Sequence, residues 1–121
     1  MSEEPTIRSD LRIKNTIDYD LSAYEAFFLA LKPSTFKYNK GTSGRTHFGF
    51  IAQDVEQAML DVGLTSSQLA ALVKDPVLEI LEDGLTDYRY SIRYGELIAL
   101  NTHMIQKLYQ MVEELLQQKE G

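Results

Sequence analysis

The chain has 121 residues, of which 44% are apolar, and a formal net charge of −6 at pH 7. This length and apolar content suffice for one compact domain with a core, which excludes a wholly disordered chain. The acidic balance argues against nucleic acid or an anionic membrane as a partner, because phosphate binding requires clustered Lys and Arg.

The sequence also limits the chemistry that the chain can carry. No run approaches the ~18 apolar residues of a transmembrane helix, and the acidic start "MSEEPTIR" lacks the apolar segment of a secretory signal. The absence of cysteine excludes disulfides and thiolate metal sites. His47 and His103 stand far apart with no metal-ligand spacing around either. We therefore expect no metal and no cofactor.

The first elements along the chain are an extended segment and a helix. The stretch "SDLRIKNTID" begins a strand or an extended segment. Ser22 and Glu25 have the spacing of a capping box, in which each side chain satisfies an amide of the first helical turn. Pro33 ends the helix. Its apolar stripe consists of Leu21, Tyr24, Phe27, Phe28 and Leu31.

A β-hairpin and a second helix are expected next. Phe36 and Tyr38, and later Phe48 and Phe50, alternate with polar residues on either side of "NKGTSG", a pattern typical of a hairpin. The helix that follows ends at Gly63 and has one apolar face, made of Ile51, Val55, Met59 and Val62.

The middle of the chain predicts a short helix and another hairpin. The helix in "SSQLAALV" is expected to end before Pro76. The hairpin turns at Asp83 and Gly84 and places three side chains on one face, those of Tyr88, Tyr90 and Ile92.

The last segment predicts a helix over about residues 95–119. A heptad can be assigned in which Glu114 and Lys119 fall at positions that pair between helices. Its a and d positions, the expected trimer interface, are Leu97, Asn101, Met104, Leu108, Met111 and Leu115. Beyond Leu108 the helix extends further than a domain of this size can cover, which favours self-association of that part. From Leu97 to Ile105, packing of the helix on its own domain is an equal alternative. The mixed order of elements indicates an α+β fold.

Three stretches occur in order along the chain: "SDLRIKNTI", "LKPSTFKYN…RTHFGFIAQDVEQ" and "YSIRYGELIALNTHMIQKL". Together they resemble the C-terminal intramolecular chaperone domain of phage endosialidase tailspikes, tail fibres and neck appendages, over nearly all of residues 9–118. The resemblance implies a domain that forms a homotrimer with a coiled-coil-like bundle of long helices. Such a domain aligns three fibre chains as they fold and then removes itself by autoproteolysis.

The resemblance also implies the residues that act. The scissile bond is Arg8–Ser9, with Ser9 as nucleophile and Lys14 as its base, so that the domain is a single-turnover, self-cleaving serine endopeptidase. Residues 1–8 are then the end of the upstream fibre or appendage chain, and residues 9–121 are the chaperone domain. Its partners are further copies of itself and the upstream segment of the same polypeptide. It acts in the host cytoplasm during assembly; the parent protein sits in the virion tail or neck, and the released domain is absent from the virion.

The chemistry is plausible for a serine that directly follows the bond it attacks. Good intramolecular orientation supplies about 7–11 kcal/mol of a reaction barrier. Attack yields an ester, which water then hydrolyses. A lysine serves as base only if its pKa falls from about 10.4 through burial or a neighbouring cation. Arg12 is a candidate for that cation, and Asp10 either orients Lys14 or closes a turn.

Spacing sets a condition on this dyad. In a strand, residues five apart point to opposite faces and lie roughly 16 Å apart, and in a helix they are also off a common face. Ser9 and Lys14 therefore meet only if "DLRI" bends or if Lys14 comes from another protomer. His47 is a candidate third member, able to polarise the scissile carbonyl or relay a proton; the alternative is a structural histidine.

Two other functions compete with self-cleavage. The first is a non-catalytic trimerisation or capping module of a phage fibre, with Ser9 an inert residue of a Ser-Asp turn. The second is an adaptor that binds an unrelated partner through its acidic surface. The presence of both Ser9 and Lys14 favours self-cleavage, because the loss of either would abolish a dyad.

Overall fold

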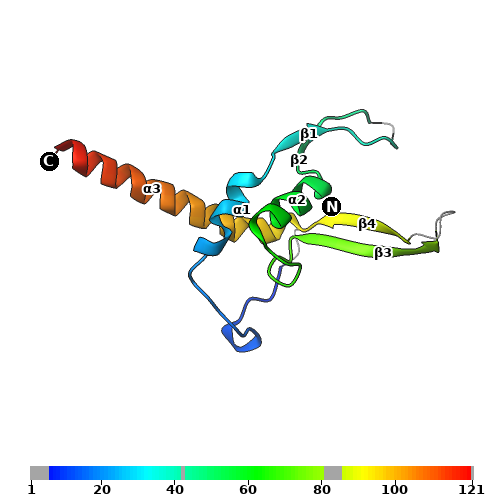
Figure 1. Cartoon of the computed structure of the whole chain (residues 1–121), viewed down its shortest axis with the longest axis horizontal. Helices are drawn as coiled ribbons and strands as arrows, with labels where there is room; N and C mark the ends of the chain where they lie inside the picture. Colours follow the sequence, from blue (N-terminus) through cyan, green and yellow to red (C-terminus); the bar gives the residue numbers. More distant parts are fainter. Residues whose placement is uncertain (1–5, 42, 81–85, 121) are drawn as a thin grey trace.

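The computed structural model describes residues 6–41, 43–80 and 86–120, and it confirms the α+β class (Figure 1). Short helices and two separate antiparallel hairpins surround the start of one long helix. The elements in order are η1 Leu11–Ile13, η2 Ser22–Tyr24, α1 Glu25–Ala30, β1 Ser34–Phe36, β2 His47–Gly49, α2 Ala52–Val62, β3 Leu72–Ile80, β4 Thr86–Ile92, η3 Tyr94–Leu97 and α3 Ile98–Glu120.

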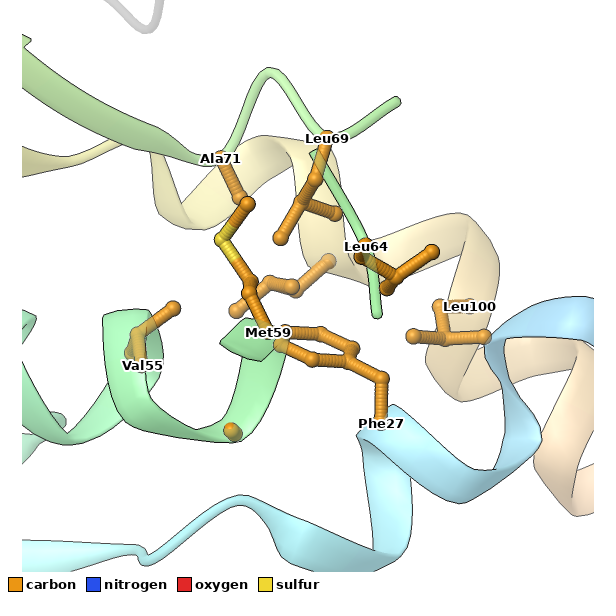
Figure 2. Packing of buried hydrophobic residues seen from close by; sticks show 9 residues of the cluster. Phe27, Val55, Met59, Leu64, Leu69, Ala71 and Leu100 are labelled. Atoms are coloured by element: carbon orange, nitrogen blue, oxygen red, sulfur yellow. The ribbon is translucent and has the colours of Figure 1, made fainter. Parts of the chain in front are cut away.

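One small core holds these elements together where α1 and α2 meet the beginning of α3 (Figure 2). Phe27 of α1 is completely buried at its centre. Burial of a Phe side chain is worth about 1.5–3 kcal/mol, so this ring is a main anchor of the fold. The other buried side chains are those of Val55, Ala58, Met59, Leu64, Leu69, Ala71, Leu97 and Leu100.

The second predicted helix forms as expected and ends at its glycine. Gly63 has φ 76°, a left-handed conformation that glycine adopts without steric cost. The amide of Gly63 donates to Leu60 O and that of Leu64 to Met59 O, so the last carbonyls of α2 are satisfied. Val55, Ala58 and Met59 then face the core from one side of this helix.

Three local predictions are wrong. Ser22 and Glu25 form no capping box, because Glu25 bonds to α3 and the Ser22 amide donates to Asp20 Oδ1. The stretch "SSQLAALV" forms a turn and the start of β3 instead of a helix. Pro76 lies inside β3, opposite Tyr88, and an irregular register follows it. A two-stranded sheet tolerates this proline because both of its strands are edges. The predicted turn at Asp83 and Gly84 falls outside the described residues.

A half-buried carboxylate joins the first helix to the last. Glu25 Oε2 lies 2.8 Å from His103 Nε2, and Glu25 Oε1 accepts a hydrogen bond from Lys107 Nζ. The hydrogen bond from Lys107, and after it that from His103, holds the pKa of Glu25 below its usual value. These contacts fix α1 against one side of α3.

A tyrosine clamps the first hairpin to the start of the long helix. Tyr94 Oη accepts a hydrogen bond from the Phe50 amide at 3.0 Å, directly after β2. Gly49 permits this approach, because a Cβ at that position would lie 2.4 Å from Tyr94 Oη and 3.1 Å from Phe36 Cε1. The glycine of "GFIAQ" is therefore a packing requirement.

Replacing Gly49 with alanine should destabilise the fold by about 1–3 kcal/mol, the usual cost of overpacking. Gly95→Ala is the matched control, because a Cβ there meets nothing within 4 Å; surface changes usually stay within about 0.5 kcal/mol. Thermal and urea unfolding followed by circular dichroism measure both. Equal stability of the two variants would contradict the clamp.

The contribution of Glu25 to stability should depend on pH. Because its pKa is lowered in the fold, this contribution is present above the unfolded value of about 4.3 and is lost as pH falls through the folded pKa. The melting temperature of Glu25→Gln should thus lie below that of the parent at pH 7, and the gap should close towards pH 3. Glu113→Gln, at an exposed position of α3, should show no such gap.

Candidate functional site

The structure brings Ser9 and Lys14 together within one chain. Lys14 Nζ donates a hydrogen bond to Ser9 Oγ at 2.6 Å. The residues between them form η1, so "DLRI" bends into one tight helical turn in place of a strand. The amide of Lys14 donates to Leu11 O and that of Ile13 to Asp10 O. The condition set by the spacing is met by this bend, without a second protomer.

Asp10 holds the bend in place. It is the N-cap of η1, and its Oδ1 accepts a hydrogen bond from the Arg12 amide at 2.8 Å. The Arg12 guanidinium also binds both carboxylate oxygens of Asp10, at 3.1 and 2.8 Å. The Arg12 side chain, followed by its amide, lowers the pKa of Asp10. Asp10 thus closes the turn, and the charge of Arg12 is paired with Asp10.

The pair is open to solvent in a single chain. Residues 6–20 are all exposed, Ser9 and Lys14 among them. Just beyond, Thr16 has φ 52°, which is rare for a β-branched residue, and marks a second bend. A hydroxyl at hydrogen-bonding distance from an amine is the arrangement of a nucleophile and its base. Only the neutral amine acts as a base, and desolvation favours that form.

His47 lies elsewhere in the chain. It belongs to β2, where its ring stacks on Phe36 and meets Tyr38 edge-on, with centroids 5.8 and 5.0 Å apart. Figure 1 shows the β1–β2 hairpin on the opposite side of the helices from the N-terminal segment that contains η1. Within one chain, His47 therefore belongs to an aromatic cluster of the hairpin.

The long helix carries the second functional surface. It runs about 35 Å at 1.5 Å per residue, and its C-terminal half projects away from the rest of the domain (Figure 1). Among the described residues, no helix is long and apolar enough to cross a membrane. Eight large apolar side chains of α3 are nevertheless exposed: Ile98, Ile105, Leu108, Tyr109, Met111, Val112, Leu115 and Leu116.

The heptad assigned from the sequence needs a correction near the domain. Leu97 is only 4% exposed and lies in the core, and Met104 packs against that core. Leu97 therefore faces the core, and packing on the chain's own domain is the right alternative for it; Met104 is partly covered by the core and also lines a groove beside α1. The exposed positions with heptad spacing are Ile98, Asn101, Ile105, Leu108, Val112 and Leu115. Steps of three and four residues separate them, as in the a and d positions of a coiled coil.

Two contacts that shape these surfaces could not be found from sequence motifs. Glu25 lies 78 residues from His103 and 82 from Lys107, and Tyr94 lies 44 from Phe50. Pairing at such distances leaves no local periodicity. The glycine before Phe50 was the one local signal, because a glycine within a strand often marks a close approach of another group.

Comparisons with known proteins agree with the motifs. Residues 9–64 match a family model described as "Chaperone of endosialidase". A solved structure, described as the crystal structure of a novel intramolecular chaperon, shares 27% sequence identity with this chain at a TM-score of 0.65. The match covers 84% of this chain and 99% of that one. The search of curated proteins finds no match.

The match to the family model starts at Ser9 and includes "GFIAQDVEQ", the motif that Gly49 and Tyr94 explain. The structural match extends the likeness to most of the chain. These findings confirm the resemblance predicted from the sequence: residues 9–64 are similar to the family described as chaperone of endosialidase, and the chain as a whole is similar in fold to a solved intramolecular chaperon.

Proposed function

We propose that this domain trimerises through α3, assists the folding of the phage fibre, tailspike or appendage chain that precedes it, and then cuts itself off between Arg8 and Ser9. The observation that carries the proposal is the 2.6 Å contact between Lys14 Nζ and Ser9 Oγ at the predicted cleavage point. The family description supports the chaperone role, and its model, named as a peptidase, begins at Ser9. Residues 1–8 are then upstream chain and residues 9–121 the chaperone domain.

The reaction needs only groups of this chain and water. Ser9 Oγ attacks the carbonyl carbon of Arg8 while Lys14 Nζ takes the hydroxyl proton. The bond between the Arg8 carbon and the Ser9 nitrogen breaks as that nitrogen receives a proton from Lys14. The resulting ester joins Arg8 to Ser9 Oγ, and water hydrolyses it to a carboxylate and the free hydroxyl. One chain cuts one bond, so turnover is single.

Assembly would control whether Ser9 and Lys14 react, and not whether their side chains come into contact. The contact forms through a local turn of one chain, but both side chains are exposed there. Cover from a neighbouring copy or from the folded fibre would remove water from Lys14 and favour its neutral form. His47 is a proposed supporting residue under the same logic, because it reaches this site only from another copy. Cleavage would then follow folding.

Ser9→Ala and Lys14→Ala should each abolish cleavage, because they remove the nucleophile and the base. Intact-mass measurement after purification should show loss of Met1–Arg8 from the parent and a whole chain for both variants. Ser66→Ala and Lys40→Ala, at exposed positions, are matched controls and should be cleaved like the parent. His47→Gln, run beside them, should slow cleavage.

Light scattering on the same samples separates the alternatives. A parent chain that forms trimers and stays whole would leave a non-catalytic trimerisation module, the second candidate. This module is supported by the exposed apolar stripe of α3. If Lys14→Ala were cleaved at the parent's rate, Lys14 would not be the base and the proposed Ser9–Lys14 dyad would be wrong.

Asp10 should act as a positioning residue. Asp10→Ala removes the N-cap of η1, which typically costs about 1 kcal/mol in local stability, whereas Asn is an equally good cap. We expect slower cleavage for Asp10→Ala and near-parent cleavage for Asp10→Asn, with the same oligomeric state in both. Equal loss in the two variants would assign the effect to the ion pair with Arg12 instead of the turn.

A further inference from the structure

An apolar groove lies between α1 and α3, beside the exposed stripe of the long helix. It encloses about 450 Å³ and is walled by Phe28 and Leu29 from α1 and by Met104, Leu108 and Met111 from α3. Leu29 is 76% exposed at its edge, although leucine is a residue that folding normally buries. The intramolecular fold leaves this surface uncovered.

The charges at the groove are neutralised within the chain. Glu25 and Lys107 also line it, but Glu25 is bonded to both Lys107 and His103. Glu25 is the only carboxylate among the described residues of the lining. The groove therefore suits an uncharged, largely apolar occupant, because a charged one would lose its hydration without gaining a partner.

The corrected heptad of α3 identifies such an occupant. With Ile98, Ile105 and Val112 at a, the flanking g positions are Met104 and Met111. The flanking e positions are Thr102, Tyr109 and Leu116, none of which carries a charge. Tyr109 is 70% and Leu116 51% exposed. In most coiled coils these flanks are charged; here they extend the apolar seam.

Helix geometry sets which flanks meet. In a closed ring whose helices run along the symmetry axis, as in the proposed trimer, the α3 helices of neighbouring copies are parallel. In parallel helices, a g residue lies beside the e residue that comes five positions later on the neighbour. Met104 then faces Tyr109 of the next copy, and Met111 faces Leu116. Both methionines line the groove.

We propose that the groove between α1 and α3 is the seat of Tyr109 from a second copy of this chain, with Leu116 packing one heptad further on. This inference rests on the proposed self-association and specifies which residues of two neighbouring copies touch. Each copy gives one tyrosine and receives another, so the contact repeats around a closed ring. Eight exposed large apolar side chains on α3 are on the scale of the ~800 Å² per partner that stable interfaces bury.

The proposed contact also bears on the number of strands. β-branched residues at a with leucine at d favour two strands in a simple parallel coiled coil. With the a and d residues of this helix, a preference for three strands would have to come from contacts outside these positions. The groove supplies them, because α1 widens the apolar face of each protomer on one flank.

Disulfide cross-linking tests the contact directly, since the chain contains no cysteine. Met104→Cys combined with Tyr109→Cys should cross-link neighbouring copies under mild oxidation. The two positions cannot bridge within one helix, because their Cα atoms lie about 9 Å apart by helix geometry, beyond the reach of a disulfide. Gln106→Cys with Glu113→Cys, exposed on the far side of α3, is the matched control.

Most of the Met104/Tyr109 variant should run on a non-reducing gel as a covalent ring of three chains, and the control as single chains. Met111→Cys with Leu116→Cys should give the same result at positions that are exposed in the monomer, which covers a loss of folding from Met104→Cys. Light scattering of the reduced samples gives the oligomeric state independently.

The outcomes are distinguishable. Trimers that fail to cross-link in both pairs would overturn the seat in the groove and leave the proposed function standing. A covalent product of two chains would support the contact of Tyr109 with the groove and would contradict an assembly of three chains. A protein that stays monomeric overturns both. Cross-linking of the control at the same rate would show random collision and overturn the contact.

Discussion

The fold depends on the docking of the first turns of the long helix into the core. Leu97 and Leu100 are buried in this core, where Leu100 lies beside Phe27 of α1 (Figure 2). Among the described residues the core has nine buried side chains, two of them alanines, so each large one carries a considerable share of the stability. Glu25 adds a polar tie one to two turns further along α3. Everything that projects from the domain, the helix and both hairpins, is held at this point.

The same docking divides α3 into two functional faces. The side that includes Leu100 packs within the chain, and Met104 lies at its edge, partly buried and lining the groove. The side with Ile98, Ile105 and Val112 is exposed, and it is the side that we propose other copies contact. One helix thus fixes the domain on one side and exposes an apolar surface on the other, and the groove beside α1 lies where the two faces meet.

Local patterns in the sequence predicted the elements whose causes are local. The second helix ends at Gly63 because that residue takes a left-handed conformation, and alternating aromatic residues mark β1 and β2. Ser22 and Glu25 matched a capping box, but the long-range partners of Glu25 outweighed the local one. Pro76 ended a predicted helix, although a two-stranded sheet accepts it. Heptad assignment had the same weakness, since periodicity alone does not tell which face the domain itself covers.

The candidate site was predictable in its residues and not in its geometry. Ser9 and Lys14 were identified as candidate catalytic residues by the family motifs found along the chain. The contact between their side chains depends on a turn that Asp10 and Arg12 close. Sequence spacing could state only that a bend was required. For His47, neither the spacing nor the single chain places the ring beside Ser9.

The exposed course of residues 6–20 has a mechanical consequence. Among the described residues, the first that packs on the core is Leu21, so under the proposed function the upstream chain would be joined to this domain through a tether that contains no buried residue. Tension or rotation in a growing fibre would be absorbed by the tether before it reached the helices. Under the proposed function, cleavage between Arg8 and Ser9 would cut this exposed segment and leave the packed part of the domain unchanged.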